Sequence, residues 1–166
     1  MTTLTAPRIY VGTYAKYNNG SIQGAWLEMD DYATRNQFEA ACQALHGAGE
    51  HEYMFQDHEG IPDGMISESS LSPDFWEWIR LSDYDKQIWS IYRANIESSS
   101  TFENAQDSFM GVYKSPEDWA IEHLDNIGDV PEHLKNYIDY EGYARDAGYE
   151  GYVFVRVNHD EYWVFY

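Results

Sequence analysis

The excess of carboxylates over cations is the feature that most constrains this chain. Of its 166 residues, 29 are Asp or Glu and 10 are Lys or Arg, which gives a formal net charge of −19 at neutral pH. Charge of one sign opposes compaction, because the carboxylates repel one another. Aromatic residues nevertheless make up 17% of the sequence, whereas disordered acidic chains are poor in aromatics. The sequence therefore predicts a folded protein whose charge requires an explanation.

The charge is concentrated in the interior of the sequence. Residues 50–150 hold 23 acidic and six basic side chains, a net charge of −17, and the segments before and after them each carry −1. A field of this sign repels nucleic acid, so direct DNA binding is excluded. It favours a partner that is basic.

Strand patterns occur at the two ends of the chain. Residues 8–14 and 22–29 are rich in β-branched and aromatic side chains and are separated by the turn sequence Asn18-Asn19-Gly20, which predicts a hairpin with a long loop. A third strand is expected over residues 53–56. At the other end, two more strands are predicted over residues 152–157 and 162–166, joined by a polar turn.

Helix signals fill the space between these strands. Thr34 and Gln37 form a capping-box pattern, and Gly47 supplies the end of that helix. A helix that opens at Ser115-Pro116 is expected to end at Gly128. Further helices are predicted to begin at Ser72-Pro73, at Ser82, near Phe102 and at Pro131, and another to cover residues 137–147. The class is thus α+β, with small antiparallel sheets and helices at both ends and a helical middle.

Acidic residues recur at helical spacing after Pro116. Steps of four, three and four place Asp118, Glu122, Asp125 and Asp129 on one face, and the opposite side holds Ala120, Leu124 and Ile127. Like charges at this spacing destabilise a helix, and no ladder of lysines offsets them. The row is interpreted either as a solvated helix face or as part of a protein-binding surface, and the scarcity of basic partners in the whole chain supports the second interpretation. The whole predicted acidic surface comprises Glu68, Asp74, Glu77, Asp83, Asp85, Glu97, Glu103, Asp107, Glu117, Asp118, Glu122, Asp125, Asp129 and Glu132.

Three segments of the sequence resemble those of one protein family. Residues 9–21, continuing in 24–29, look like its opening signature; residues 52–62 are similar to its next block; and residues 140–146, with the terminal aromatic hairpin, resemble its end. The family is that of the ArdA antirestriction proteins, and the resemblance spans essentially the whole chain.

The resemblance implies an elongated, curved homodimer whose protomer has three small consecutive domains, here residues 1–60, 61–103 and 104–166. It also implies a function without catalysis. The carboxylates would imitate the phosphates of B-form DNA and occupy the DNA-binding channel of a type I restriction-modification enzyme, at its methyltransferase core. The acidic antirestriction motif of some members is not clear in this sequence. No cofactor, no metal and no catalytic residue is expected.

The apolar run over residues 109–113 is a candidate for the dimer contact. Phe109, Met110, Val112 and Tyr113 are flanked by polar residues and could pair with their copies across a two-fold axis. The alternative is a loop or short strand inside the protomer.

Other functions have weaker support in the sequence. A hydrolase that uses two carboxylates, and an acidic module that binds a histone-like protein, both remain open. His46, His51 and His58 have spacings that match no common metal site. Cys42 has no partner for an intramolecular disulfide and is expected to be buried. No signal peptide and no apolar stretch of about 18 residues is apparent, which predicts a soluble cytoplasmic protein.

Overall fold

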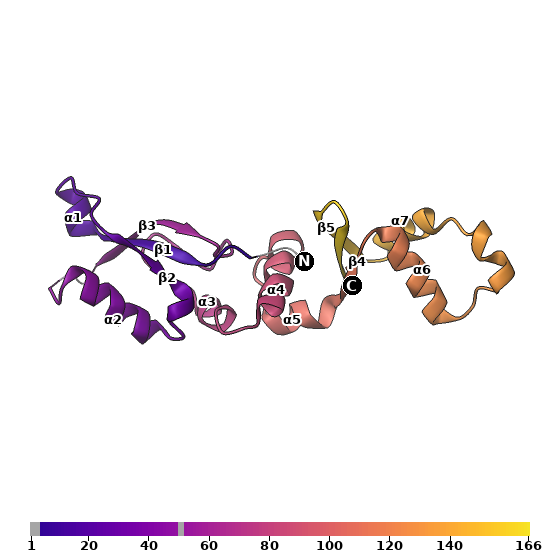
Figure 1. Ribbon diagram of the computed structural model, residues 1–166, viewed down its shortest axis with the longest axis horizontal. Coiled ribbons are helices and arrows are strands. Elements are labelled where there is room, and N and C mark those ends of the chain that lie inside the picture. The colour runs from indigo at the N-terminus through magenta and orange to yellow at the C-terminus, as the bar shows by residue number, and fades with distance from the viewer. Residues whose placement is uncertain (1–3, 50–51) are drawn as a thin grey trace. The chain divides into compact units, whose positions relative to one another are not determined.

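The computed structural model describes residues 4–49 and 52–166. The chain divides into two compact units, with the boundary between Ser90 and Ile91. Each unit contains one three-stranded antiparallel sheet together with helices (Figure 1). The α+β class and the small antiparallel sheets are therefore confirmed. The finer division into three domains stays a prediction.

The sheet of the N-terminal unit has its first strand in the middle. Strands β1 (Arg8–Thr13), β2 (Ala25–Glu28) and β3 (Tyr53–Glu59) are ordered β2-β1-β3, and both pairings are antiparallel. Ile9 and Val11 of β1 are fully buried, which is typical of a central strand. The predicted hairpin is confirmed, although β2 begins at Ala25, three residues later than expected.

A short helix, α1 (Tyr14–Asn18), replaces the end of the first predicted strand. The strand stops at Thr13 because the Thr13 hydroxyl accepts a hydrogen bond from the backbone N–H of Lys16 at 3.2 Å and so caps the helix. A Thr at an N-cap satisfies a backbone donor that would otherwise lack a partner. The loop expected between β1 and β2 therefore starts with a helical turn.

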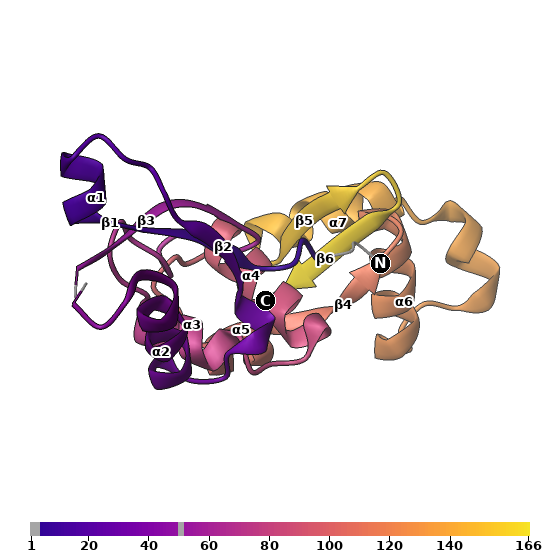
Figure 2. The same ribbon diagram turned by 60° about the vertical axis from the view of Figure 1, so that its left-hand side comes forward.

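Helix α2 (Arg35–His46) follows the predicted pattern closely. The Thr34 hydroxyl accepts from the Gln37 N–H, and the Gln37 side chain accepts in return from the Thr34 N–H, which completes the capping box. Gly47 ends the helix with a positive φ of 91°. Figures 1 and 2 both show α2 along one side of the β2-β1-β3 sheet, where its Phe38 and Cys42 are buried.

Two helices with buried indoles complete the N-terminal unit, α3 (Pro73–Trp78) and the first part of α4 (Asp83–Asn95). Trp78 and Trp89 are both buried. The Trp78 Nε1–H donates to the Ser90 hydroxyl at 3.0 Å. Lys86 is buried as well, with its Nζ 5.1 Å from the Trp78 ring centroid and 3.6 Å from Asp30 Oδ1. Asp30 lies in the short helix η1 (Met29–Asp31).

The C-terminal unit builds its sheet from a predicted hairpin and one further strand. Its elements after α4 are α5 (Phe102–Ser108), β4 (Phe109–Tyr113), α6 (Pro116–Ile127), η2 (Glu132–Tyr137), α7 (Tyr140–Tyr149), β5 (Val153–Asn158) and β6 (Glu161–Phe165). The strand order is β4-β6-β5, and all pairings are antiparallel. The terminal hairpin is thus confirmed, and the apolar run at 109–113 forms the strand β4.

Helices α6 and α7 pack against each other and against this sheet. Trp119 and Ala120 from α6, Ala144 and Ala147 from α7, and Val164 from β6 form one buried cluster. The small alanines allow the two helices to approach closely around the large Trp119 ring. Both ribbon views show the segment between α6 and α7 reaching away from the β4-β6-β5 sheet (Figures 1 and 2).

The helix predicted over residues 137–147 is shifted along the chain. The 3-10 helix η2 ends at Tyr137, and α7 begins at Tyr140 and continues to Tyr149. The reason is Asp139, whose carboxylate accepts a hydrogen bond from the Gly142 N–H at 2.9 Å and caps α7. A side-chain cap at this position starts a new helix rather than extending the previous one.

Candidate functional site

Carboxylates cover the outward side of α6. Ser115 caps the helix, because its Oγ accepts a hydrogen bond from the Asp118 N–H at 3.0 Å, and Pro116 occupies the first turn. Trp119 and Ala120 face inward and are buried. The acidic residues of the helix are all exposed: Glu117, Asp118, Glu122 and Asp125. The acidic face predicted from the spacing therefore exists within α6.

The acidic row ends earlier than the spacing suggests. Helix α6 stops at Ile127, and Gly128 adopts a left-handed φ of 75°, which a residue without Cβ tolerates best. Asp129 follows this reversal, so it is exposed but lies beyond the helix. Ile127, which the spacing predicts on the apolar side of α6, is 49% exposed. The α6 row therefore runs from Asp118 to Asp125.

One carboxylate of the row contacts the sheet. The hydroxyl of Tyr113, from β4, donates a hydrogen bond to Glu122 Oε1 at 3.4 Å. Burial raises the pKa of Tyr113 above its usual value, and the negative charge of Glu122 raises it further. The phenol therefore stays protonated at neutral pH and orients the Glu122 side chain.

Lys135 neutralises part of this surface. Its Nζ lies 2.9 Å from Asp125 Oδ1 and 3.0 Å from Glu132 Oε2. Hydrogen bonds to Asp125 and then to Glu132 raise the pKa of Lys135 above its usual value. Helical spacing within α6 could not reveal this cation, because it comes from η2 and only the fold brings it to the helix.

Two predicted surface residues have a local structural role. Asp85 accepts from the Ser82 hydroxyl at 2.7 Å, and its N–H donates back to Ser82 Oγ at 3.1 Å, at the start of α4. Asp74 lies in the first turn of α3. Carboxylates near a helix N-terminus are stabilised by the helix dipole. Both side chains are half-buried, so they contribute less to the surface than the sequence suggested.

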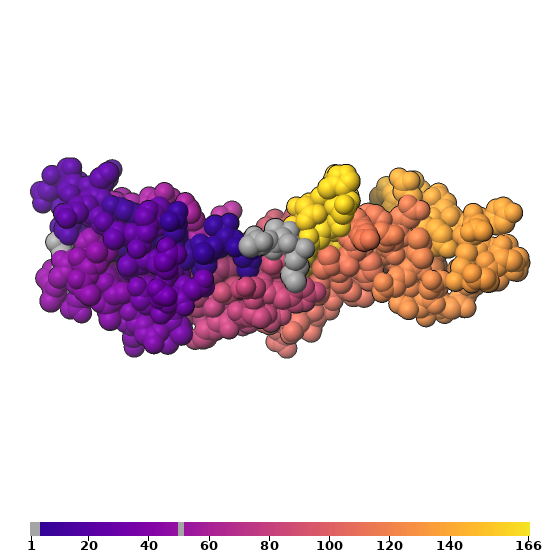
Figure 3. All heavy atoms as spheres, viewed as in Figure 1, coloured from indigo at the N-terminus to yellow at the C-terminus, as the bar shows by residue number. Residues whose placement is uncertain are grey.

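The other twelve of the fourteen predicted surface carboxylates are exposed. Across the described residues, 25 of 28 acidic side chains are exposed. The chain up to Ser90 has a net charge of −9, and the residues from Ile91 onward have −10. The segment from α6 to α7, coloured orange in Figure 3, lies on the surface of the C-terminal unit that this view shows. Both units therefore display a large excess of negative charge.

Sequence reasoning missed a group of exposed carboxylates around α7, namely Asp139, Glu141, Asp146 and Glu150. Gly142 weakened the helical signal there, although the acidic residues were visible. The opposite case is Glu161, which is 6% exposed. Its two carboxylate oxygens accept from the Trp163 indole at 2.8 Å and from the Asn158 amide at 2.6 Å, so it fixes the β5-β6 hairpin.

The proposed dimer residues lie on two faces of β4. Phe109 packs on Phe165 with ring centroids 5.5 Å apart, and Tyr113 contacts the buried cluster around α6. Met110 and Val112 point the other way and are 45% and 39% exposed. β4 pairs with β6 on one side and is an edge strand of the sheet. A subunit contact at this place would therefore use Met110 and Val112.

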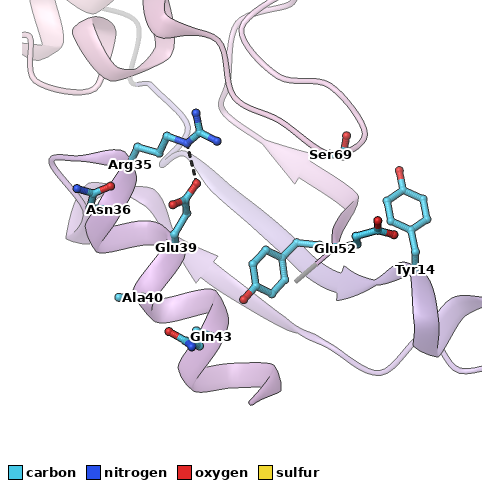
Figure 4. A pocket seen from close by; sticks show the side chains of 9 residues that line it. Tyr14, Arg35, Asn36, Glu39, Ala40, Gln43, Glu52 and Ser69 are labelled. Carbon is cyan, nitrogen blue, oxygen red and sulfur yellow. Dashed lines mark hydrogen bonds and ion pairs between the residues drawn. The ribbon is translucent and has the colours of Figure 1, made fainter. Parts of the chain in front are cut away.

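An open pocket lies beside α2 and β3, with a volume of about 870 Å³ (Figure 4). Arg35 Nε donates to Glu39 Oε1 at 2.6 Å within it. The lining contains two carboxylates, Glu39 and Glu52, and the first of them is paired with Arg35. Its residues are Tyr14, Arg35, Asn36, Glu39, Ala40, Gln43, Glu52, Tyr53 and Ser69.

The histidines considered as metal ligands are not gathered. His46 accepts a hydrogen bond from Lys16 Nζ at 2.8 Å through Nδ1 and donates to the Val11 carbonyl at 2.9 Å through Nε2. His58 is exposed on β3, and His51 lies outside the described residues. Within residues 4–49 and 52–166, no group of three or more His, Cys, Asp or Glu side chains is arranged to hold a metal ion. None of the helices in that part of the chain is long and apolar enough to cross a membrane.

Comparison with known proteins identifies the family. No curated protein matches the chain. A family model described as "Antirestriction protein (ArdA)" matches residues 9–161, which is nearly the whole sequence. The chain therefore belongs to the ArdA family of antirestriction proteins.

Proposed function

We propose that this protein is a non-catalytic mimic of duplex DNA that occupies the DNA-binding channel of a type I restriction-modification enzyme. Membership of an antirestriction family supports a role against restriction. The observation that carries the mimicry is the exposure of 25 of 28 described acidic side chains. Carboxylates form charge-assisted hydrogen bonds with Lys and Arg, as phosphates do. An exposed array of them can therefore satisfy the cations that line a DNA channel.

The amount of charge supports the same proposal. Duplex DNA carries one charge per about 1.7 Å of its axis, so the charge of two chains at −19 each corresponds to roughly 65 Å of duplex. The inhibitor would act as a homodimer, in contact through Met110 and Val112 of the β4 edge. It would act in the cytoplasm of a bacterial cell, where restriction enzymes meet incoming DNA.

Displacement of DNA tests this function directly. Purified protein is titrated into a complex of a type I methyltransferase core with a fluorescent target duplex, at about 50 and 200 mM salt. Displacement at micromolar protein that weakens at the higher salt is expected, because salt screens interactions between exposed charges. A duplex that stays bound at both salt concentrations would refute the proposal.

Two arms of the experiment separate the alternatives. Binding to a basic histone-like protein without displacement of DNA from the enzyme would support an acidic interaction module. Turnover of a substrate would support a hydrolase that uses two carboxylates.

The matched control for the displacement assay is a variant whose α6 carboxylates are replaced by amides, which keeps the shape of the side chains and removes their charge.

A further inference from the structure

A second pocket in the N-terminal unit differs in charge from the surface around it. Its volume is about 380 Å³, and it is lined by Thr34, Arg35, Leu71, Pro73, Trp76 and Arg80. The lining contains two guanidinium groups and no carboxylate. The chain up to Ser90 has five basic residues against fourteen acidic ones. Two of the five basic residues therefore meet at one site.

The other three basic residues of this unit have partners within it. The Arg8 guanidinium lies 2.8 Å from Glu59, Lys16 bonds to His46, and the buried Lys86 faces Asp30. Arg35 binds Glu39 through Nε, and a guanidinium has further donors on its terminal nitrogens. Arg80 is exposed, and no ion pair joins it to a carboxylate in the described part of the chain. Both arginines therefore retain donors for an external acceptor.

The surroundings of the two arginines favour a carboxylate with a short apolar stem. Helix α2 begins at Arg35, so the positive end of its dipole adjoins the pocket. Leu71 and Trp76 are half-buried and, with Pro73, form an apolar wall. An Asp or Glu side chain has both a carboxylate and a methylene stem, which suit these two parts of the pocket.

We propose that this pocket receives a carboxylate side chain of the restriction-modification enzyme, an inference that rests on the function proposed above. DNA presents amine donors on its bases as well as phosphates, and proteins read the cytosine amine with Asp or Glu. An acidic side chain in a DNA channel would be repelled by a surface that carries carboxylates alone. Arg35 and Arg80 present donors to such a side chain and fix the orientation of the inhibitor in the channel.

Charge reversal at Arg80 tests the inference by the sign of its effect. If the surface acts only through its total negative charge, Arg80→Glu makes it more negative and displaces DNA as well as the wild type or better. The carboxylate pocket predicts the opposite, a loss of at least tenfold in apparent affinity. Arg145→Glu is the matched control, since Arg145 is an exposed residue of α7 beside Asp146 and the charge change is the same. It is expected to bind as tightly as the wild type or more tightly.

Further variants keep the outcome decisive. Arg80→Ala removes the donors without adding charge and is expected to weaken displacement less than Arg80→Glu, and circular dichroism verifies the fold of each variant. Displacement by Arg80→Glu equal to that of Arg145→Glu would overturn the inference. Saturable binding of benzoate that Arg80→Glu abolishes, with unchanged DNA displacement, would also overturn it by assigning the pocket to a small free acid. If the wild type displaces no DNA, the proposed function fails first, and this inference falls with it.

Discussion

Replacing Gly142 by Ala changes the stability differently in two backgrounds if the cap of α7 works as the structure indicates. Gly142 is the third residue of α7, and its N–H donates to the Asp139 carboxylate at 2.9 Å. An added Cβ would lie 2.8 Å from Asp139 Cγ and still closer to a carboxylate oxygen. The Asp139 side chain is short, so it can avoid this overlap only by leaving its capping position.

The magnitudes follow from the two effects that compete. Ala is favoured over Gly in a helix by up to about 1 kcal/mol. Loss of an N-cap costs about 1 kcal/mol. We therefore expect Gly142→Ala to leave the free energy of unfolding unchanged or lower it by about 1 kcal/mol. Asp139→Ala alone should lower it by about 1 kcal/mol. In the Asp139→Ala background there is no carboxylate to displace, so Gly142→Ala should then stabilise by up to about 1 kcal/mol.

Urea unfolding of the four proteins in this double-mutant cycle measures the coupling. The expected coupling free energy between the two sites is about 1 kcal/mol. A Gly142→Ala change that stabilises both backgrounds equally would show that the carboxylate does not obstruct the new methyl group, and the reasoning would be wrong. The matched control is Gly148→Ala, at a helical position of α7 where an added Cβ meets no atom within 4 Å. It should stabilise both backgrounds alike.

Three further predictions concern the surface, the thiol and the subunit contact. Each single amide replacement on α6 should weaken DNA displacement by no more than about fivefold, since an exposed ion pair contributes at most about 1 kcal/mol. The quadruple variant with Glu117→Gln, Asp118→Asn, Glu122→Gln and Asp125→Asn should weaken displacement by about tenfold or more in the same assay. A single replacement that abolished inhibition would contradict this account. Burial raises the pKa of Cys42 to about 12 from a usual 9.0, so Ellman's reagent should react with this thiol at pH 8 only after unfolding. Between these two pKa values the thiol is ionised in the unfolded chain but not in the folded one. The free energy of unfolding should therefore fall more steeply with rising pH in the wild type than in Cys42→Ala. Val112→Lys should convert a dimer to a monomer of 19.4 kDa in sedimentation equilibrium without loss of secondary structure, whereas a dimer that persists would move the subunit contact away from the β4 edge.

Local signals in the sequence predicted most of the helices and strands. The capping box before α2, the Ser-Pro starts of α3 and α6, and the glycine after α6 each satisfy or release backbone groups within a few residues. Their effect does not depend on distant parts of the chain. The same holds for the terminal hairpin, whose alternating apolar residues are close in sequence. The positions where prediction failed, α1 and the start of α7, depend on single side-chain caps with weak sequence patterns.

The sequence by itself determined the sign and amount of charge, the α+β class and the resemblance to the ArdA family, because these are properties of composition and local order. Tertiary structure decided how individual side chains are used. It buried Glu161 in a hairpin, brought Lys135 to Asp125, and divided residues 109–113 between a half-buried and an exposed face of β4. It also placed Arg80 at the same pocket as Arg35, forty-five positions away. Such contacts join residues distant in the chain, and only packing of the elements against one another determines which of them meet.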